Sequence, residues 1–193
     1  MDWGDVPSWL GVAGAAGAFG IGLWQYVTAQ AWKRAEFVSA EMKAFFGDPQ
    51  VATALTLIDY SVIRLNQDGK LSKTGWEFND AKLVDSLAVH TKFVNEIEKF
   101  SDDEFLARMA FDALLTGLER FDHYLQANLI TLDDLKIYLA YWIDKMGNPS
   151  SGWKEPPFYV ALHGFVRAYE YRGVQHLFTL FTISPPTLPA VRR

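Results

Sequence analysis

Residues 9–27 read WLGVAGAAGAFGIGLWQYV and form an uncharged, apolar block near the start of the chain. Its one strongly polar side chain belongs to Gln25. A helix that crosses a lipid bilayer needs about 20 consecutive, predominantly apolar residues. The block therefore predicts a transmembrane helix over residues 8–30.

Charged residues on the two sides of this block differ in sign. Asp2 and Asp5 precede it, and the first basic residues of the chain, Lys33 and Arg34, follow it. Because basic residues gather on the cytoplasmic side of a span, we expect residues 1–7 to form a short external tail and the body to lie in the cytoplasm. This arrangement predicts a protein of the bacterial inner (cytoplasmic) membrane. The predicted membrane-interface anchors are Trp9, Trp24, Trp32, Lys33 and Arg34.

Two other interpretations of the block are less favoured. A cleaved signal peptide needs basic residues before its apolar run, and none is present. A core or hairpin helix in water is disfavoured by the block's five glycines, because each costs about 1 kcal/mol relative to alanine. Lipid tolerates glycine in a helix better, so the sequence favours the membrane span.

Small residues recur within the block at intervals of four. Gly14, Ala18 and Gly22 lie on one helical face, and such rows let two helix backbones approach closely in lipid. Chance spacing in a Gly/Ala-rich block is the alternative explanation. We expect a helix-association face here, with the lipid bilayer and either a second copy or another membrane protein as partners.

The remainder of the chain has the periodicity of helices. Apolar residues recur every three or four positions, which predicts that residues 31–183 form a cytoplasmic α-helical domain of about six helices. The first helix is expected to continue to Phe46, and the next ones begin at Asp48-Pro49, Asn79 or Asp80, Ser101, Thr131, Pro156 and Gly173. The third helix carries apolar positions as far as Ile97, and the fourth, which runs to about Ala127, is the best candidate for the central helix of the core. Only residues 178–183 resemble a β-strand in their sequence. Residues 184–193 predict a flexible, Pro-rich tail, so the fold class is all-α, with the transmembrane helix continuing into a helical bundle.

Composition excludes several classes of chemistry. The 193 residues contain no cysteine, which excludes disulfides, a cysteine nucleophile and thiolate metal sites. The net charge of −5 argues against a nucleic-acid partner, since such proteins carry basic surfaces.

Known catalytic and ligand-binding motifs are missing. The chain has no phosphate-binding loop, zinc-protease motif or nucleophile elbow, and no arginine precedes a histidine at the spacing of two-helix ribonucleases. The turn-rich residues 66–79 are predicted to form the longest loop, and residues 66–69 within it superficially resemble a calcium loop. Aligning Gly69 with the sharp turn places Arg64 at the first ligand position, so we reject calcium binding. No cofactor or metal site is predicted.

Three polar residues remain as candidates for chemistry. Asp59 follows the apolar residues 54–58 and needs a partner if it is buried. Arg64 or Lys43 could form a structural ion pair with it, and a functional acid is the second interpretation. Glu119 and His123 lie four apart on one helical face, where an exposed salt bridge is favoured over half of a metal site. The lone His90, on an apolar helical face, is interpreted as a core residue.

Residues 31–51, AWKRAEFVSAEMKAFFGDPQV, together with residues 57–60, LIDY, resemble uncharacterised bacterial proteins that begin with one membrane helix and continue as a helical cytoplasmic domain. Residues 141–143 and 173–175 are more loosely similar. No settled activity comes with this resemblance. It implies the layout and a bacterial origin only.

These observations lead to three hypotheses of different classes. The first is a membrane-anchored interaction or scaffold protein without catalysis, self-associating or part of a membrane complex. The second is a stress or anti-phage effector whose oligomerising helix perturbs the bilayer. The third is a helical metal-dependent enzyme that uses Asp59, Glu119 or His123.

Overall fold

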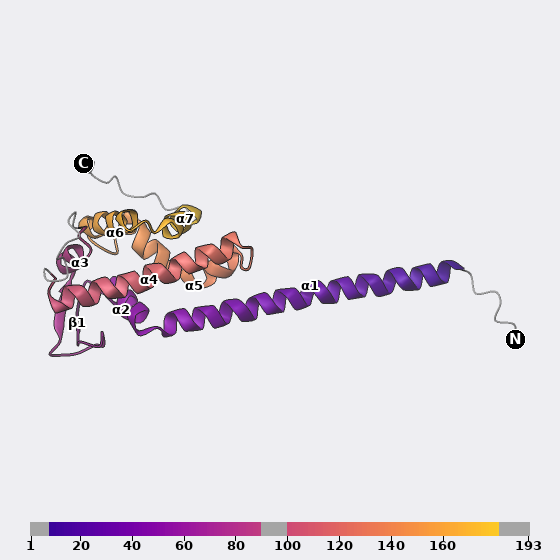
Figure 1. Cartoon of the computed structure of the whole chain (residues 1–193), viewed down its shortest axis with the longest axis horizontal. Helices are drawn as coiled ribbons and strands as arrows, with labels where there is room; N and C mark the ends of the chain where they lie inside the picture. Colours follow the sequence, from indigo (N-terminus) through magenta and orange to yellow (C-terminus); the bar gives the residue numbers. More distant parts are fainter. Residues whose placement is uncertain (1–7, 90–99, 182–193) are drawn as a thin grey trace. The chain divides into compact units, whose positions relative to one another are not determined.

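The structure is a computed structural model that describes residues 8–89 and 100–181, with side chains for residue 15 and from residue 17 onward within those ranges. Two units, residues 1–40 and 41–193, are described separately. Over the described residues the fold is helical, as predicted (Figure 1). The elements are α1 (Ser8–Gly47), α2 (Pro49–Asp59), β1 (Val62–Leu65), β2 (Trp76–Asn79), α3 (Asp80–Ser86), α4 (Asp102–Gln126), α5 (Leu132–Gly147), a 3-10 turn (Pro149–Ser151), α6 (Pro156–Ala168) and α7 (Arg172–Leu180).

Helix α1 is 40 residues long and includes the apolar block together with the residues up to Gly47. The expectation that the first helix runs past the block without a break is confirmed. Among the residues with described side chains, no helix meets the length and apolarity that a membrane crossing requires.

Helix α2 begins where the sequence predicts. The Asp48 carboxylate accepts hydrogen bonds from the backbone N–H groups of Gln50 and Val51, and Pro49 occupies the first turn. A carboxylate cap and a proline in the first turn both favour a helix start. The apolar face that follows, including Leu57 and Ile58, is buried in the body.

A β-hairpin between α2 and α3 was not predicted. Strands β1 and β2 pair antiparallel, with Ile63 opposite Phe78 and Arg64 opposite Glu77. Buried and exposed residues alternate along β1, but four residues give too short an alternation to recognise in the sequence. The interpretation of residues 66–79 as one long loop is therefore wrong at its end, where β2 forms.

Helix α3 is shorter than expected. It begins at Asp80 after the Asn79 cap, as predicted, and ends at Ser86. Leu83 and Leu87 are buried. The predicted continuation through His90 to Ile97 lies outside the described residues.

Helix α4 is the central helix of the body. A capping box formed by Ser101 and Glu104 starts it, and it packs against α2, α3 and α7. Figure 1 shows it passing between α2 on one side and α6 and α7 on the other. Phe111 and Phe121 are fully buried along it, which confirms the prediction of a core helix.

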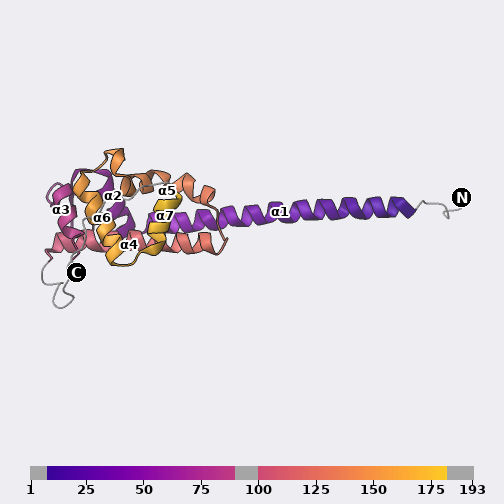
Figure 2. The same ribbon diagram turned by 90° about the horizontal axis from the view of Figure 1, so that it is seen from above.

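The last three helices complete the body (Figure 2), and of them α7 packs against α4. Thr131 and Asp134 form the capping box of α5, and Pro156 opens α6, both as predicted. Helix α7 includes Phe178, so the described part of the strand-like residues 178–183 is mostly helical. The predicted tail, residues 184–193, lies outside the described residues.

Candidate functional site

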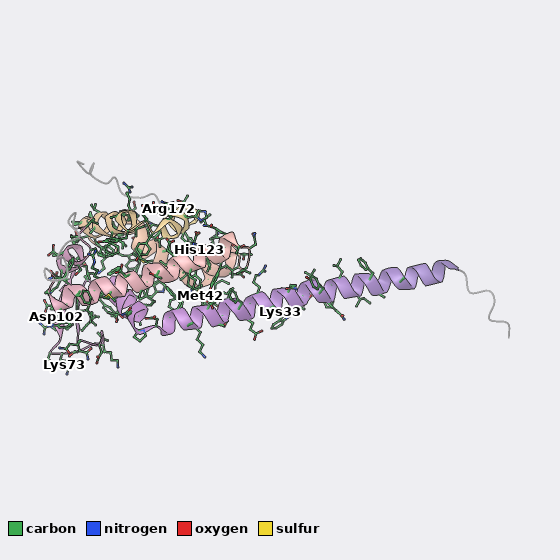
Figure 3. The ribbon with its side chains drawn as sticks, viewed as in Figure 1. Lys33, Met42, Lys73, Asp102, His123 and Arg172 are labelled. Atoms are coloured by element: carbon green, nitrogen blue, oxygen red, sulfur yellow. The ribbon has the colours of Figure 1, made fainter. Side chains whose placement is uncertain are left out.

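Large apolar side chains cover the described part of the N-terminal block on every side of α1. Phe19 is 72% exposed, Trp24 68% and Trp32 73%. Successive helical residues are separated by 100°, so these positions and their neighbours point in all directions around the helix. Figure 3 shows side chains projecting from more than one side of α1. The exposed apolar residues of this segment are Phe19, Ile21, Leu23, Trp24, Tyr26, Val27 and Trp32.

The predicted association face lies on the same helix. Ala18 is exposed, and a Cβ atom at Gly22 would meet no atom within 4 Å. The side chain of Trp9 and the surroundings of Gly14 lie outside the described residues. Lys33 and Arg34 are both exposed. Whether this face binds another helix stays a prediction.

Asp59 forms an ion pair, as predicted, but with an unexpected partner. Its carboxylate contacts Nζ of Lys145 on α5 and accepts a hydrogen bond of 2.8 Å from the Tyr141 hydroxyl. The expectation of Arg64 or Lys43 is wrong, because Arg64 pairs with Glu77 across the hairpin. The packing of α2 against α5 brings together residues 86 positions apart, which local spacing does not reveal.

Asp59 and Lys145 are both stabilised in their charged forms. Hydrogen bonds from Lys145 and Tyr141 lower the pKa of Asp59 below its usual value. Burial alone would lower the pKa of Lys145, but its hydrogen bonds to Asp59 and Tyr141 outweigh burial and raise it. The Lys145 side chain is 3% exposed and that of Asp59 34%. A buried, fully paired lysine is a structural feature, so we assign Asp59 no chemical role.

A second buried lysine lies beside the first. Nζ of Lys154 donates hydrogen bonds to the Tyr60 carbonyl at 2.6 Å and to Asp80 at 2.8 Å. Lys145 also contacts the Trp153 ring, with Nζ 4.4 Å from the ring centroid. We call Asp59, Asp80, Lys145 and Lys154 the lysine–aspartate cluster. It joins α2, α3, α5 and the loop before α6.

The predicted Glu119–His123 pair does not come together. Glu119 instead accepts a hydrogen bond of 2.9 Å from the backbone N–H of Val174 at the start of α7, and His123 is exposed. Within the described ranges, no group of three histidine, aspartate or glutamate residues could hold a metal ion.

A carboxylate–imidazole pair that the sequence did not reveal lies next to Glu119. Asp122 is fully buried, and its Oδ1 lies 2.6 Å from Nδ1 of His176 on α7. Its Oδ2 accepts a hydrogen bond of 2.5 Å from Gln126. An aspartate orients an imidazole in this way in catalytic triads, but catalysis also needs a nucleophile beside the ring. Here the pair links α7 to α4. Its two residues are 54 positions apart, so local spacing in the sequence does not predict it.

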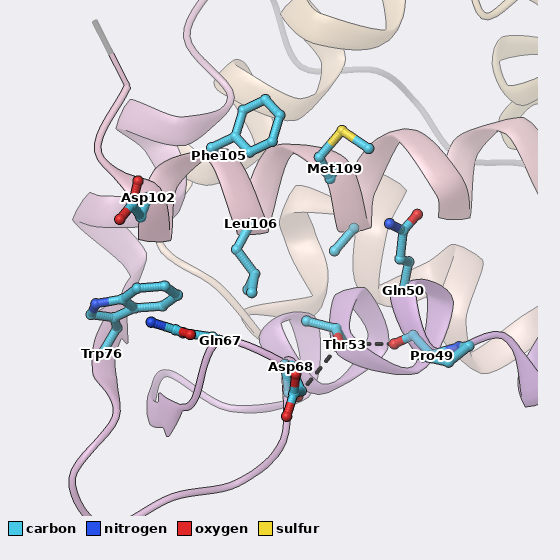
Figure 4. A pocket seen from close by; sticks show the side chains of 12 residues that line it. Pro49, Gln50, Thr53, Gln67, Asp68, Trp76, Asp102, Phe105, Leu106 and Met109 are labelled. Atoms are coloured by element: carbon cyan, nitrogen blue, oxygen red, sulfur yellow. Dashed lines mark hydrogen bonds between the residues drawn. The ribbon is translucent and has the colours of Figure 1, made fainter. Parts of the chain in front are cut away.

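Two cavities lie along α4 on the side that faces α2, and Figure 4 shows the first of them. One section, of about 410 Å³, lies between the loop 67–69, Trp76 and the start of α4. The other, of about 560 Å³, continues toward Arg120. Gln50 and Met109 line both sections, so the two sections are neighbours along α4. We call the two sections together the α4 groove.

The α4 groove has an apolar floor and acidic edges. Phe105 is 42% exposed and Met109 38% exposed along it. Its charged residues are Asp48, Asp68, Asp102, Asp112 and Arg120. Arg120 lies 3.6 Å from a Glu41 carboxylate oxygen. Burial raises the pKa of Asp112, against the lowering effect of a hydrogen bond from Tyr171.

Comparison with protein-family models, with curated proteins and with solved structures found no match to this chain.

Proposed function

We propose that this chain is a membrane-anchored helical interaction protein. Residues 8–30 form the anchor in the bacterial inner membrane, residues 1–7 lie outside, and the helical body acts in the cytoplasm without catalysis. The observation that carries the proposal is the ring of exposed apolar side chains between Phe19 and Trp32. The start of the block, where part of the anchor would lie, belongs to residues without described side chains.

The energetic argument concerns apolar area left in water. A helix that is apolar on all sides is stable when it is buried in a large core or in a membrane. Burying one large apolar side chain is worth about 1.5–3 kcal/mol, and seven of them are exposed between residues 19 and 32. A bilayer would recover free energy on the order of 10 kcal/mol, and a partner helix would add to it.

Alkaline carbonate extraction tests the anchor. We expect the chain to stay in the membrane pellet of expressing bacteria. Phe19→Arg with Leu23→Arg places two charges inside the block and should release most of it, because each costs about 2.5–3.5 kcal/mol near the centre of a span. Ser39→Arg with Ala40→Arg, at exposed positions beyond the block, is the control and should stay in the pellet. Extraction of the unaltered chain at alkaline pH would overturn the anchor.

Single cysteines test the orientation. The chain has no cysteine of its own, so Asp5→Cys and Lys73→Cys each create a unique thiol. In intact cells whose outer membrane has been permeabilised, an impermeant maleimide should label the first variant and not the second. Labelling of Lys73→Cys under these conditions would place the body outside and reverse the proposed topology.

Native mass spectrometry in mild detergent tests self-association. Gly22→Leu adds a bulky side chain to the small-residue face and should reduce the oligomer fraction, because close helix approach requires small residues. Gly20→Leu is the matched control, since it lies on nearly the opposite side of α1. An oligomer that responds equally to both variants, or no oligomer at all, would remove self-association from the proposal.

A further inference from the structure

We propose that the first section of the α4 groove, the cavity of about 410 Å³ beside Trp76, binds a small organic cation with an apolar body, such as an arylalkylamine. We call this section the Trp76 cavity. It belongs to a different part of the molecule from the membrane anchor, and binding there does not depend on the anchor. Three features of the cavity support a cationic ligand: an exposed apolar lining, carboxylates without a partner, and walls fixed by contacts within the body.

One face of α4 places an acid beside apolar side chains. Asp102, Phe105 and Met109 all line the Trp76 cavity, and residues three and seven positions apart lie on the same side of a helix. The side chains of Phe105 and Met109 are exposed along the cavity, so an apolar ligand body would remove their surface from water. A volume of about 410 Å³ lies within the range of small-molecule sites, about 300–1,000 Å³.

The charge of the cavity selects a cation. Asp68 and Asp102 line it, and no basic residue is among the described residues of its lining. Within the described part of the chain, neither carboxylate takes part in a hydrogen bond or an ion pair. The cap of α4 is formed by Ser101 and Glu104, so the Asp102 carboxylate is not engaged as the cap. The ring of Trp76, which is partly exposed in the same wall, attracts cations to its face.

The walls of the cavity are fixed before any ligand binds. The side-chain oxygen of Asn66 accepts hydrogen bonds from the backbone N–H groups of Asp68 at 3.1 Å and of Lys70 at 2.9 Å. The Thr53 hydroxyl on α2 donates a hydrogen bond of 3.4 Å to the Gly69 carbonyl, drawn as a dashed line in Figure 4. These bonds hold the loop 67–69 against α2. A preformed site loses little conformational entropy when a ligand binds.

Fluorine NMR of the full chain in nonionic detergent tests the proposal, with 5-fluorotryptophan as the label and 2-phenylethylamine as the ligand probe. Trp76→Phe identifies the Trp76 signal among those of the seven tryptophans. We expect a saturable shift of this signal as 2-phenylethylamine is added. 2-Phenylethanol, which replaces the ammonium group by a hydroxyl, should bind roughly tenfold more weakly, because it loses both the ion pairs and the contact of the cation with the ring. Equal affinity for the two compounds, or no shift of the Trp76 signal, would overturn the proposal.

Removal of the two carboxylates gives a second readout. Asp68→Asn with Asp102→Asn should weaken binding of 2-phenylethylamine roughly tenfold, since each exposed ion pair contributes up to about fivefold. The matched control, Glu36→Gln with Asp133→Asn, also removes two exposed acids, both outside the cavity, and should leave the affinity unchanged. Unaltered signals of the other tryptophans show that both variants are folded. Equal weakening by the two pairs of substitutions would reduce the effect to net charge and overturn the site.

Discussion

Gly117 on α4 lies directly against the ring of Phe45 at the end of α1. A Cβ atom at Gly117 would lie only 2.6 Å from Cδ2 of that ring. The ring also packs edge-on against Phe121, with centroids 5.1 Å apart. A glycine is needed at this interior position of α4 because any larger side chain would overlap the ring of Phe45.

The first prediction follows from this contact. Gly117→Ala should lower the free energy of unfolding by about 1–3 kcal/mol, the usual effect of overpacking, although alanine favours helices. Gly164→Ala is the control, since a Cβ atom there meets no atom within 4 Å, and it should raise stability by up to about 1 kcal/mol. Urea denaturation measures both. Stabilisation by both variants would show that the ring moves aside without cost.

The second prediction concerns the lysine–aspartate cluster. Asp59→Asn leaves the buried Lys145 without its counter-charge and should cost about 3 kcal/mol, the low end of the range for breaking a buried pair, since Asp59 is partly exposed. Adding Lys145→Met removes the stranded charge and should recover much of that loss. Chemical denaturation of these two variants and of Lys145→Met alone measures the coupling. Purely additive effects would mean that the pair contributes no interaction energy.

The third prediction is a pH dependence. His163 is buried, its Nε2 lies 3.3 Å from the Gly147 carbonyl, and burial lowers the pKa of His163 from 6.5 to about 4. The unfolded chain therefore binds a proton at a higher pH than the folded chain does. The neutral imidazole of His163 contributes its full share to the free energy of unfolding above pH 6.5. This contribution is lost as the pH falls toward 4.

Between pH 7 and pH 5 this loss amounts to about 2 kcal/mol. His163→Gln does not titrate and should flatten the pH dependence of the unfolding free energy by that amount. His123→Gln removes an exposed histidine and should leave the profile nearly unchanged. If His163→Gln retains the full pH dependence, the destabilisation in acid comes from other groups.

Local signals predicted the helices of the body well. The Asp48 cap, the Ser101 capping box and Pro156 each act on the backbone within a few residues, so the sequence alone reveals them. The hairpin was missed because its strands have four residues each, and their pairing depends on burial of Ile63 and Phe78 in the body.

The candidate sites were harder to predict than the helices. Asp59 was correctly assigned to an ion pair, but its partner lies on α5. The contact between Asp122 and His176 was not predicted for the same reason, because His176 lies on a distant helix, α7. Both contacts are formed by packing of helices that are distant in the chain, and sequence periodicity identifies the apolar face of a helix without identifying its neighbour.

The lysine–aspartate cluster also has a consequence for synthesis on the ribosome. Asp59 and Asp80 are made early, whereas Lys154 contacts residues 74 and 94 positions before it. Contacts of such long sequence separation form late and slow folding. During synthesis, the contacts that join α2 and α3 to the loop before α6 can therefore form only after Lys154 has emerged.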